Sequence, residues 1–168
     1  RLIVEADVLT AAGGSDWTGI LNAAGIGDFD TADAANKADA LHRAITVVRV
    51  ALEREPTAYG LSPEDFEDFY LEKGEDGHYL HHRGPLEGGP QTVWGLPATV
   101  STVFTKPIVG DWARGATLWV RDGISIAIDR IDDQFLEGLW TIRAQTRAAF
   151  AVKQPLAFCT VENFDDAS

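Results

Sequence analysis

The chain has 168 residues, of which 45% are hydrophobic and 24% are charged, a balance typical of a globular protein with an ordered core. Its 26 acidic residues against 14 basic ones give a formal charge of -12, which repels a phosphate backbone and disfavours direct nucleic-acid binding. A single cysteine excludes an internal disulfide and a cysteine-based zinc site, and no apolar run approaches the roughly 20 residues of a membrane span.

The first residues, RLIVEADVLT, predict a helix that is already in progress, because apolar side chains recur at helical spacing. The chain contains no methionine, so we expect these residues to be a piece of a longer protein. A loop region rich in Gly, Asp and Asn follows, from Gly13 to Asp33. Its acids most simply cap the next helix.

Two further helices are predicted. The first carries an apolar face and should end near Glu55, before Pro56; that face consists of Ala38, Leu41, Ile45, Val48 and Leu52. After a short buried strand at 57–61, Ser62 is suited to cap a helix whose first residue is Pro63. This second helix should turn its aromatic side chains inward and stop at Gly74.

The second half predicts strands. After a polar, glycine-rich excursion at 74–90, the segment TVWGLPATVST is extended, since Pro97 disfavours helix at the preceding residue. Asp122-Gly123 predicts a tight hairpin between ATLWV and ISIAI. Period-two alternation over 140–152 predicts one long strand with an arginine-rich second face, and 156–164 a last short strand. The fold class is therefore mixed α+β.

Few groups suggest catalysis or metal binding. His78, His81 and His82 are the best metal candidates, although a solvated loop is the plainer interpretation because no partner ligands follow a recognisable pattern. Cys159 lies in an apolar strand, which favours an inert packed thiol over a nucleophile. Two acidic groups have calcium-like spacing, but capping and turn roles explain them more simply: Asp28, Asp30 and Asp33, and Asp129, Asp132 and Asp133.

No phosphate-binding glycine loop and no Gly-x-Ser-x-Gly nucleophile motif is present. What remains are features of a contact surface: five tryptophans, a long polar excursion and a long strand. They suit a subunit that binds copies of itself.

The order of motifs resembles the C-terminal part of a tailed-bacteriophage major capsid protein of the Hong Kong 97 type. The resemblance covers essentially the whole chain and rests on six segments in the right order: WTGILN, the long helix, YGLSPEDFEDFYLEKGEDGHYL, GGPQTVWGLPATVST, IVGDWARGATLWVRDGISIAI and DDQFLEGLWTIRAQTRAAFAVKQPLAF. It implies an axial domain, with a central mixed sheet flanked by helices, formed mainly by residues 1–133. Residues 134–168 would add strands to a peripheral domain, and the N-terminal arm, the extended loop and much of the spine helix would be absent.

The resemblance also implies a contact site. The segment that matches the loop pointing to the capsomer axis would supply subunit contacts through His78, Tyr79, His81, His82, Arg83, Pro85, Glu87 and Gln91. Some members of the family join subunits by a lysine–asparagine isopeptide bond assisted by a glutamate. Gly138 and Gln145 stand at the matching asparagine and glutamate positions and can play neither role, so no such cross-link is expected.

The resemblance implies the function of a structural major capsid protein of a tailed phage or prophage, which self-assembles into pentamers and hexamers of an icosahedral head, with no enzymatic activity and no cofactor. Its partners would be copies of itself, with the portal and a scaffold protein as further candidates, and no specific nucleic-acid site or membrane. It would reside in the virion capsid after synthesis in the bacterial cytoplasm. Two alternatives stay open: an encapsulin-like compartment shell, and a metal-dependent hydrolase that uses His78, His81 and His82.

Overall fold

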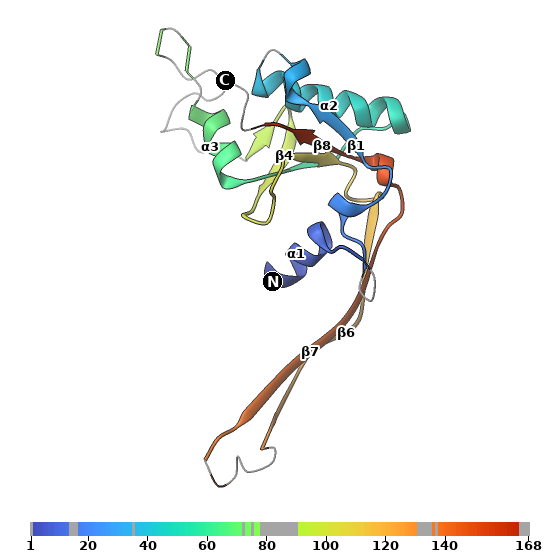
Figure 1. The fold of residues 1–168 in the computed structure, drawn as a ribbon, viewed down its shortest axis with the longest axis vertical. Coiled ribbons are helices and arrows are strands. Elements are labelled where there is room, and N and C mark those ends of the chain that lie inside the picture. Colours follow the sequence, from blue (N-terminus) through green and yellow to red (C-terminus); the bar gives the residue numbers. More distant parts are fainter. Residues whose placement is uncertain are drawn as a thin grey trace.

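The computed structural model describes residues 2–13, 17–34, 36–71, 73–74, 76–77, 91–130, 136 and 138–164. A body made of a sheet and helices carries a long two-stranded arm that extends away from it (Figure 1). The elements, in chain order, are α1 (Leu2–Thr10), η1 (Ile20–Asn22), β1 (Gly27–Asp30), η2 (Thr31–Asp33), α2 (Lys37–Leu52), β2 (Ala58–Leu61), α3 (Pro63–Leu71), β3 (Thr92–Val93), β4 (Leu96–Val100), β5 (Ile108–Gly110), β6 (Ala116–Asp129), β7 (Thr141–Val152), η3 (Pro155–Ala157) and β8 (Phe158–Glu162).

The body is built on a six-stranded mixed sheet with the order β1-β8-β5-β2-β4-β3. Strands β1 and β8 are parallel, as are β2 and β4, whereas the other neighbours are antiparallel. The sheet therefore brings together strands from the start, the middle and the end of the described chain. The predicted mixed α+β class is confirmed.

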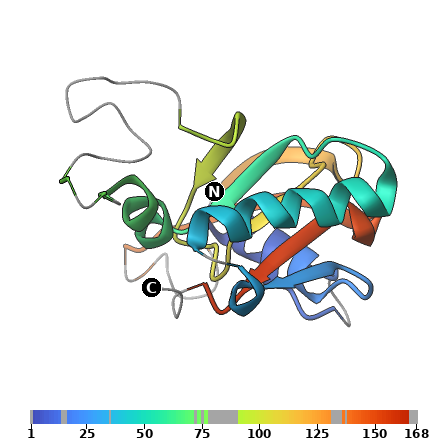
Figure 2. The same ribbon diagram turned by 90° about the horizontal axis from the view of Figure 1, so that it is seen from above.

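Helix α2 crosses the strands on one face of this sheet (Figure 2). Its apolar stripe, which includes Leu41, Ile45 and Val48, is buried in one cluster with side chains of β2, β5 and β8. The hydroxyl of Tyr59 donates a hydrogen bond of 2.8 Å to the Leu41 carbonyl, which satisfies both polar groups inside the core. Burial raises the pKa of the Tyr59 hydroxyl, so the ring stays neutral.

The N-cap of α2 differs from the expectation. The side chain of Asn36, rather than an acid, accepts the backbone N–H of Asp39 at 2.8 Å. Asp30 caps η2 instead, where it accepts the Ala32 N–H at 3.0 Å, and this contact lowers the pKa of its carboxyl. The prediction that the acids cap the long helix is therefore wrong, because a short 3₁₀ turn intervenes and an amide lies directly before the first helical residue.

Helix α3 begins as predicted. Ser62 Oγ accepts the backbone N–H of Asp65 at 3.0 Å, and Pro63 occupies the first helical position. The helix ends at Leu71, three residues before the expected stop at Gly74. Lys37 of α2 pairs with Asp68 at 3.1 Å, which joins the two helices at their surface.

The opposite face of the sheet meets a second core cluster at the root of the arm. Trp112 is partly buried and packs against this cluster: the indole N–H donates to the Ala58 carbonyl at 3.0 Å, and the ring lies edge-on to Phe158, with centroids 5.2 Å apart. Gly110 and Gly115 lie against Phe158 and Ala157 so closely that no Cβ fits. The chain is thus tightly fixed where it leaves and re-enters the body.

The arm consists of β6 and β7, which pair antiparallel from Ala116–Val152 near the body to Asp129–Thr141 at the far end, with two register shifts around Asp122. The predicted tight hairpin at Asp122-Gly123 is wrong, since both residues lie within the continuous strand β6 and Gly123 has no positive φ. Strand β6 has 14 residues and β7 has 12, and the register shifts on both sides of Asp122 accommodate the difference. The Asp-Gly pair therefore marks a bulge. The predicted long strand is confirmed as β7.

The last strand, β8, lies between β1 and β5 in the body. The predicted grouping of β8 with β7 in residues 134–168 differs from the sheet topology, in which these strands belong to separate sheets. How the body and the arm correspond to axial and peripheral domains stays a prediction. Among the described residues, no helix is long and apolar enough to cross a membrane.

The thiol of Cys159 should be unreactive in the folded protein. It is fully buried on β8, and burial, with a smaller contribution from the charge of Asp28, raises its pKa to about 12. At pH 8 roughly one thiol in ten thousand is then ionised. Iodoacetamide should leave the folded protein unlabelled and modify the same protein promptly in urea, as followed by mass spectrometry. Labelling of the folded chain at the rate of a free thiol would contradict this.

Gly110→Ala should destabilise the body. The added Cβ would lie 2.7 Å from the Ala157 carbonyl oxygen and against the Phe158 ring. The free energy of unfolding, measured in urea, should therefore fall by about 1 to 3 kcal/mol. Gly123→Ala is the matched control, because nothing lies within 4 Å of its Cβ position. Its effect should stay within about 0.5 kcal/mol. Equal stability of the two variants would show that the root is not tightly packed.

Candidate contact surfaces

The two faces of the arm differ in polarity. Side chains of paired residues share a face, and alternate residues of β7 point to the same side. One face is apolar and carries Leu118, Val120, Ile126, Ile128, Ile142, Ala144, Ala148 and Phe150. The other face is polar and carries Asp122, Ser125, Asp129, Arg143, Gln145 and Arg147.

The apolar face is covered only near the body. Phe150 is 9% exposed and meets the Trp17 ring edge-on, with centroids 6.5 Å apart. Farther out, Ile126 and Ile142 are each 67% exposed and Ile128 is 61% exposed. A two-stranded sheet in water is marginal without a covering layer, and a continuous apolar patch of this kind is typical of an interaction site. The outer arm therefore has the character of a contact surface.

Polar and aromatic side chains satisfy one another on the rest of the arm. Arg147 lies 3.9 Å from the Asp122 carboxylate, and the Arg143 guanidinium donates to Gln145 Oε1 at 3.1 Å. The cations of Arg130 and Lys153 lie 4.0 and 5.4 Å from the ring centroids of Trp140 and Trp119. The Arg147–Asp122 and Arg143–Gln145 pairs leave the polar face compatible with water, so the two faces of the arm differ in what they can contact.

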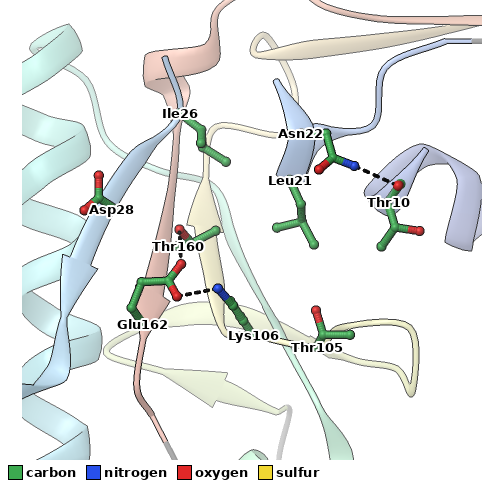
Figure 3. Close-up of a pocket in the computed structure, with 9 residues that line it drawn as sticks. All are labelled: Thr10, Leu21, Asn22, Ile26, Asp28, Thr105, Lys106, Thr160 and Glu162. Atoms are coloured by element: carbon green, nitrogen blue, oxygen red, sulfur yellow. Dashed lines mark hydrogen bonds and ion pairs between the residues drawn. The ribbon is translucent and has the colours of Figure 1, made fainter. Parts of the chain in front are cut away.

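A pocket of about 490 Å³ lies at the β1 end of the sheet, between the body and the C-terminal end of α1 (Figure 3). Its lining is mixed: Thr10, Leu21, Asn22, Ile26, Asp28, Thr105, Lys106, Thr160 and Glu162. Lys106 pairs with Glu162, and Asn22 Nδ2 donates to the Thr10 carbonyl at 2.8 Å. These polar groups thus hold one another in place. The lining favours a structural or binding role over acid–base chemistry.

Most of the predicted axial contact residues lie outside the described residues: His78, Tyr79, His81, His82, Arg83, Pro85 and Glu87. Gln91 is described; it is exposed, and its carbonyl accepts the Ala98 N–H at 2.8 Å. The metal hypothesis falls on the same undescribed segment. Within the described ranges no group of three or more His, Cys, Asp or Glu side chains could hold a metal ion. Asp129 ends β6, and Asp132 and Asp133 lie outside the described residues.

Trp94 is a prominent surface residue that the sequence alone did not identify. Trp94 and Gly95 form the two-residue turn between β3 and β4, with φ values of 50° and 79°. The available signal was an X-Gly pair between apolar residues, which is typical of a two-residue hairpin turn with positive φ at both positions. The side chain of Trp94 lies against α2 and is 52% exposed.

Comparison with known proteins agrees with this geometry. The model of the phage capsid family matches residues 2–163. No curated protein matches the chain at the level of sequence. Among solved structures, the capsid of an empty GTA particle computed with C5 symmetry has a TM-score of 0.73 at 16% identity, covering 93% of this chain and 59% of that one.

Phages and compartment shells both occur among the structural matches. A Gordonia phage Cozz chain has a TM-score of 0.73 at 17% identity, covering 94% of this chain and 57% of that chain. A chain of the holo-SrpI encapsulin complex from Synechococcus elongatus has a TM-score of 0.64 at 17% identity, with coverage of 96% and 60%. The present chain thus spans about three fifths of the length of these structures, and at such identity the likeness shows the fold.

The family match extends over nearly the whole chain, and the structural matches cover more than nine tenths of it. The chain belongs to the phage capsid family and has the Hong Kong 97-type fold that the order of its sequence motifs predicted.

Proposed function

We propose that this chain is the shell-forming part of a major capsid protein, which assembles with copies of itself into the pentamers and hexamers of an icosahedral phage head. The observation that carries the proposal is the exposed apolar face of the arm. The role is structural and needs neither cofactor nor turnover. The protein would reside in the virion after synthesis in the host cytoplasm, with the portal and a scaffold protein as further candidate partners.

Burial of the apolar face of the arm against a neighbouring copy would be energetically favourable. Burying an isoleucine side chain stabilises a protein by roughly 1.5 to 3 kcal/mol, and Ile126, Ile128 and Ile142 are still mostly exposed. A neighbouring copy that covered this row would contribute several kcal/mol per contact on this scale, before the entropy lost on association. Repeated around a shell, such contacts suffice for self-assembly without a covalent link.

Within this proposal, the six-stranded body is the axial domain and the arm is the peripheral part. The segment that contains His78, His81, His82 and Arg83 would face the capsomer axis, followed by Gln91. Contacts around a five-fold or six-fold axis are heterologous, because one edge of each copy meets a different edge of the next. A body with unlike edges, β1 on one side and β3 on the other, suits such a ring.

An encapsulin-like compartment is the alternative that the structural matches support, since the SrpI encapsulin and a virus-like particle from Pyrococcus furiosus are among them. The contents of purified particles distinguish the two functions. Packaged DNA would favour the phage head, whereas a stoichiometric protein cargo would favour the compartment.

Ile126→Asp should abolish shell formation, because it places a charge on the exposed apolar face of the arm. The protein expressed from its complete gene should yield particles in electron microscopy, and the variant should sediment as small species. Ser125→Asp, on the opposite face of the same strand, is the matched control and should assemble. Normal particles from Ile126→Asp would show that this face is not a contact surface.

Particles should contain no isopeptide cross-link. Gly138 lacks the amide that such a bond requires, and Gln145 lacks the carboxylate; its Oε1 accepts hydrogen bonds from Arg143. Boiled particles should therefore migrate on denaturing gels as a single chain. A ladder of covalent multimers that persists under reducing conditions would contradict the prediction.

A further inference from the structure

The turn between β3 and β4 holds a tryptophan in a backbone conformation that tryptophan rarely adopts. Two-residue turns with positive φ at both positions favour Asn, Asp or Gly at the first one, where Trp94 has a φ of 50°. In this region the Cβ of an L-residue lies close to the following carbonyl oxygen. The side chain of Trp94 must therefore form interactions that offset a backbone penalty.

Some of the interactions that compensate for this backbone conformation are formed within the chain. The Trp94 indole N–H donates to the Ala38 carbonyl at 2.9 Å, and the His42 ring lies edge-on to it with centroids 4.8 Å apart. Both contacts are to α2, and they fix the ring in one orientation. About half of the side chain is nevertheless left in water. The indole is thus presented on the surface as a rigid, half-exposed group.

The hairpin that carries Trp94 contains no charged residue. Between Glu87 and Lys106 there is no Asp, Glu, Lys or Arg, although the chain as a whole carries a formal charge of -12. Identical copies with this charge repel one another, so the surfaces through which they meet should be low in charge. Exposed neutral residues surround the tryptophan on the hairpin: Gln91, Thr92, Gly95, Pro97 and Thr99.

We propose that Trp94 is an anchor of the contact between neighbouring copies of this chain within a ring. Strand β3 is an edge of the sheet, and a ring closes by joining that side of one copy to a different side of the next. Because β3 has only two residues, little backbone is available for pairing and side chains must supply the contact. Rigid tryptophans at such positions are typical interface anchors. The inference rests on the proposed shell function, since the occupant is a second copy.

Trp94→Asn tests the anchor in the protein expressed from its complete gene. Asparagine tolerates positive φ, so the unassembled variant should unfold within a few degrees of the wild type. The concentration needed for assembly, measured by light scattering, should rise at least tenfold. The control is Val50→Ala, which shortens a different exposed apolar side chain, one that lies on α2. This substitution should change the concentration needed for assembly less than twofold. Assembly of Trp94→Asn within twofold of the wild type would overturn the anchor.

A second measurement needs no substitution and remains decisive if Trp94→Asn does not fold. In hydroxyl-radical footprinting by mass spectrometry, the oxidation rate of Trp94 should fall several-fold when wild-type chains assemble, while that of Val50 stays the same. Particles in which Trp94 is as reactive as in the free chain would overturn the anchor and leave the shell function standing. A wild-type protein that forms no particles would overturn both.

Discussion

Strand β8 holds the body together, because it is hydrogen-bonded on both sides and buried on both faces. It pairs with β1 and with β5, and its side chains belong to both core clusters, Phe158 to one and Cys159 and Val161 to the other. Thr31 Oγ1 also donates to the Glu162 carbonyl at 2.7 Å, across a sequence separation of 131 residues. The five-residue strand β8 thus connects β1, from the start of the chain, to the middle of the sheet. A body with such distant pairings is expected to fold more slowly than a helical bundle.

The arm poses the opposite problem. Two strands pair with each other, interrupted only by the bulge around Asp122, yet a two-stranded sheet has no second layer to cover its apolar side. The root is rigid, because Trp112 and the closely packed Gly110 and Gly115 fix where the chain leaves the body. The fixed root determines the direction of the arm, and the outer arm leaves its apolar side chains exposed. Together they hold an exposed apolar surface at a defined direction from the body, which the proposed role as a shell subunit requires.

Individual helices, caps and strands could be predicted from the sequence wherever a single short-range pattern determined the local structure. The apolar period of α2, the Ser62 cap and the alternation in β7 each predicted the element that forms. Where two outcomes share a signal, the sequence did not distinguish them: Asp122-Gly123 suits a tight turn and a bulge equally, and pairing with distant β7 selects the bulge.

The contact surfaces were predictable to a different extent. That β7 has an apolar and an arginine-bearing face follows from its alternation, but not that β6 extends the same apolar face beyond the body. The position of β8 depends on pairings with strands far away in the sequence, and no local pattern reports them. Trp94 was missed because its significance lies in a backbone angle and in the carbonyl of Ala38, neither of which a sequence displays.

The register of β5 and β8 has a consequence for how such shells diversify. Gly110, the last residue of β5, is the partner of Phe158, the first residue of β8, so the chain leaves and returns at the same end of two neighbouring inner strands. The antiparallel strands β5 and β8 are therefore connected by residues 111–157, which form an insertion that includes the arm. Its length can change in steps of paired residues while the strand order of the body stays as it is. Related capsids could therefore change the length of the arm, and with it the curvature of the shell, while the strand order of the body is retained.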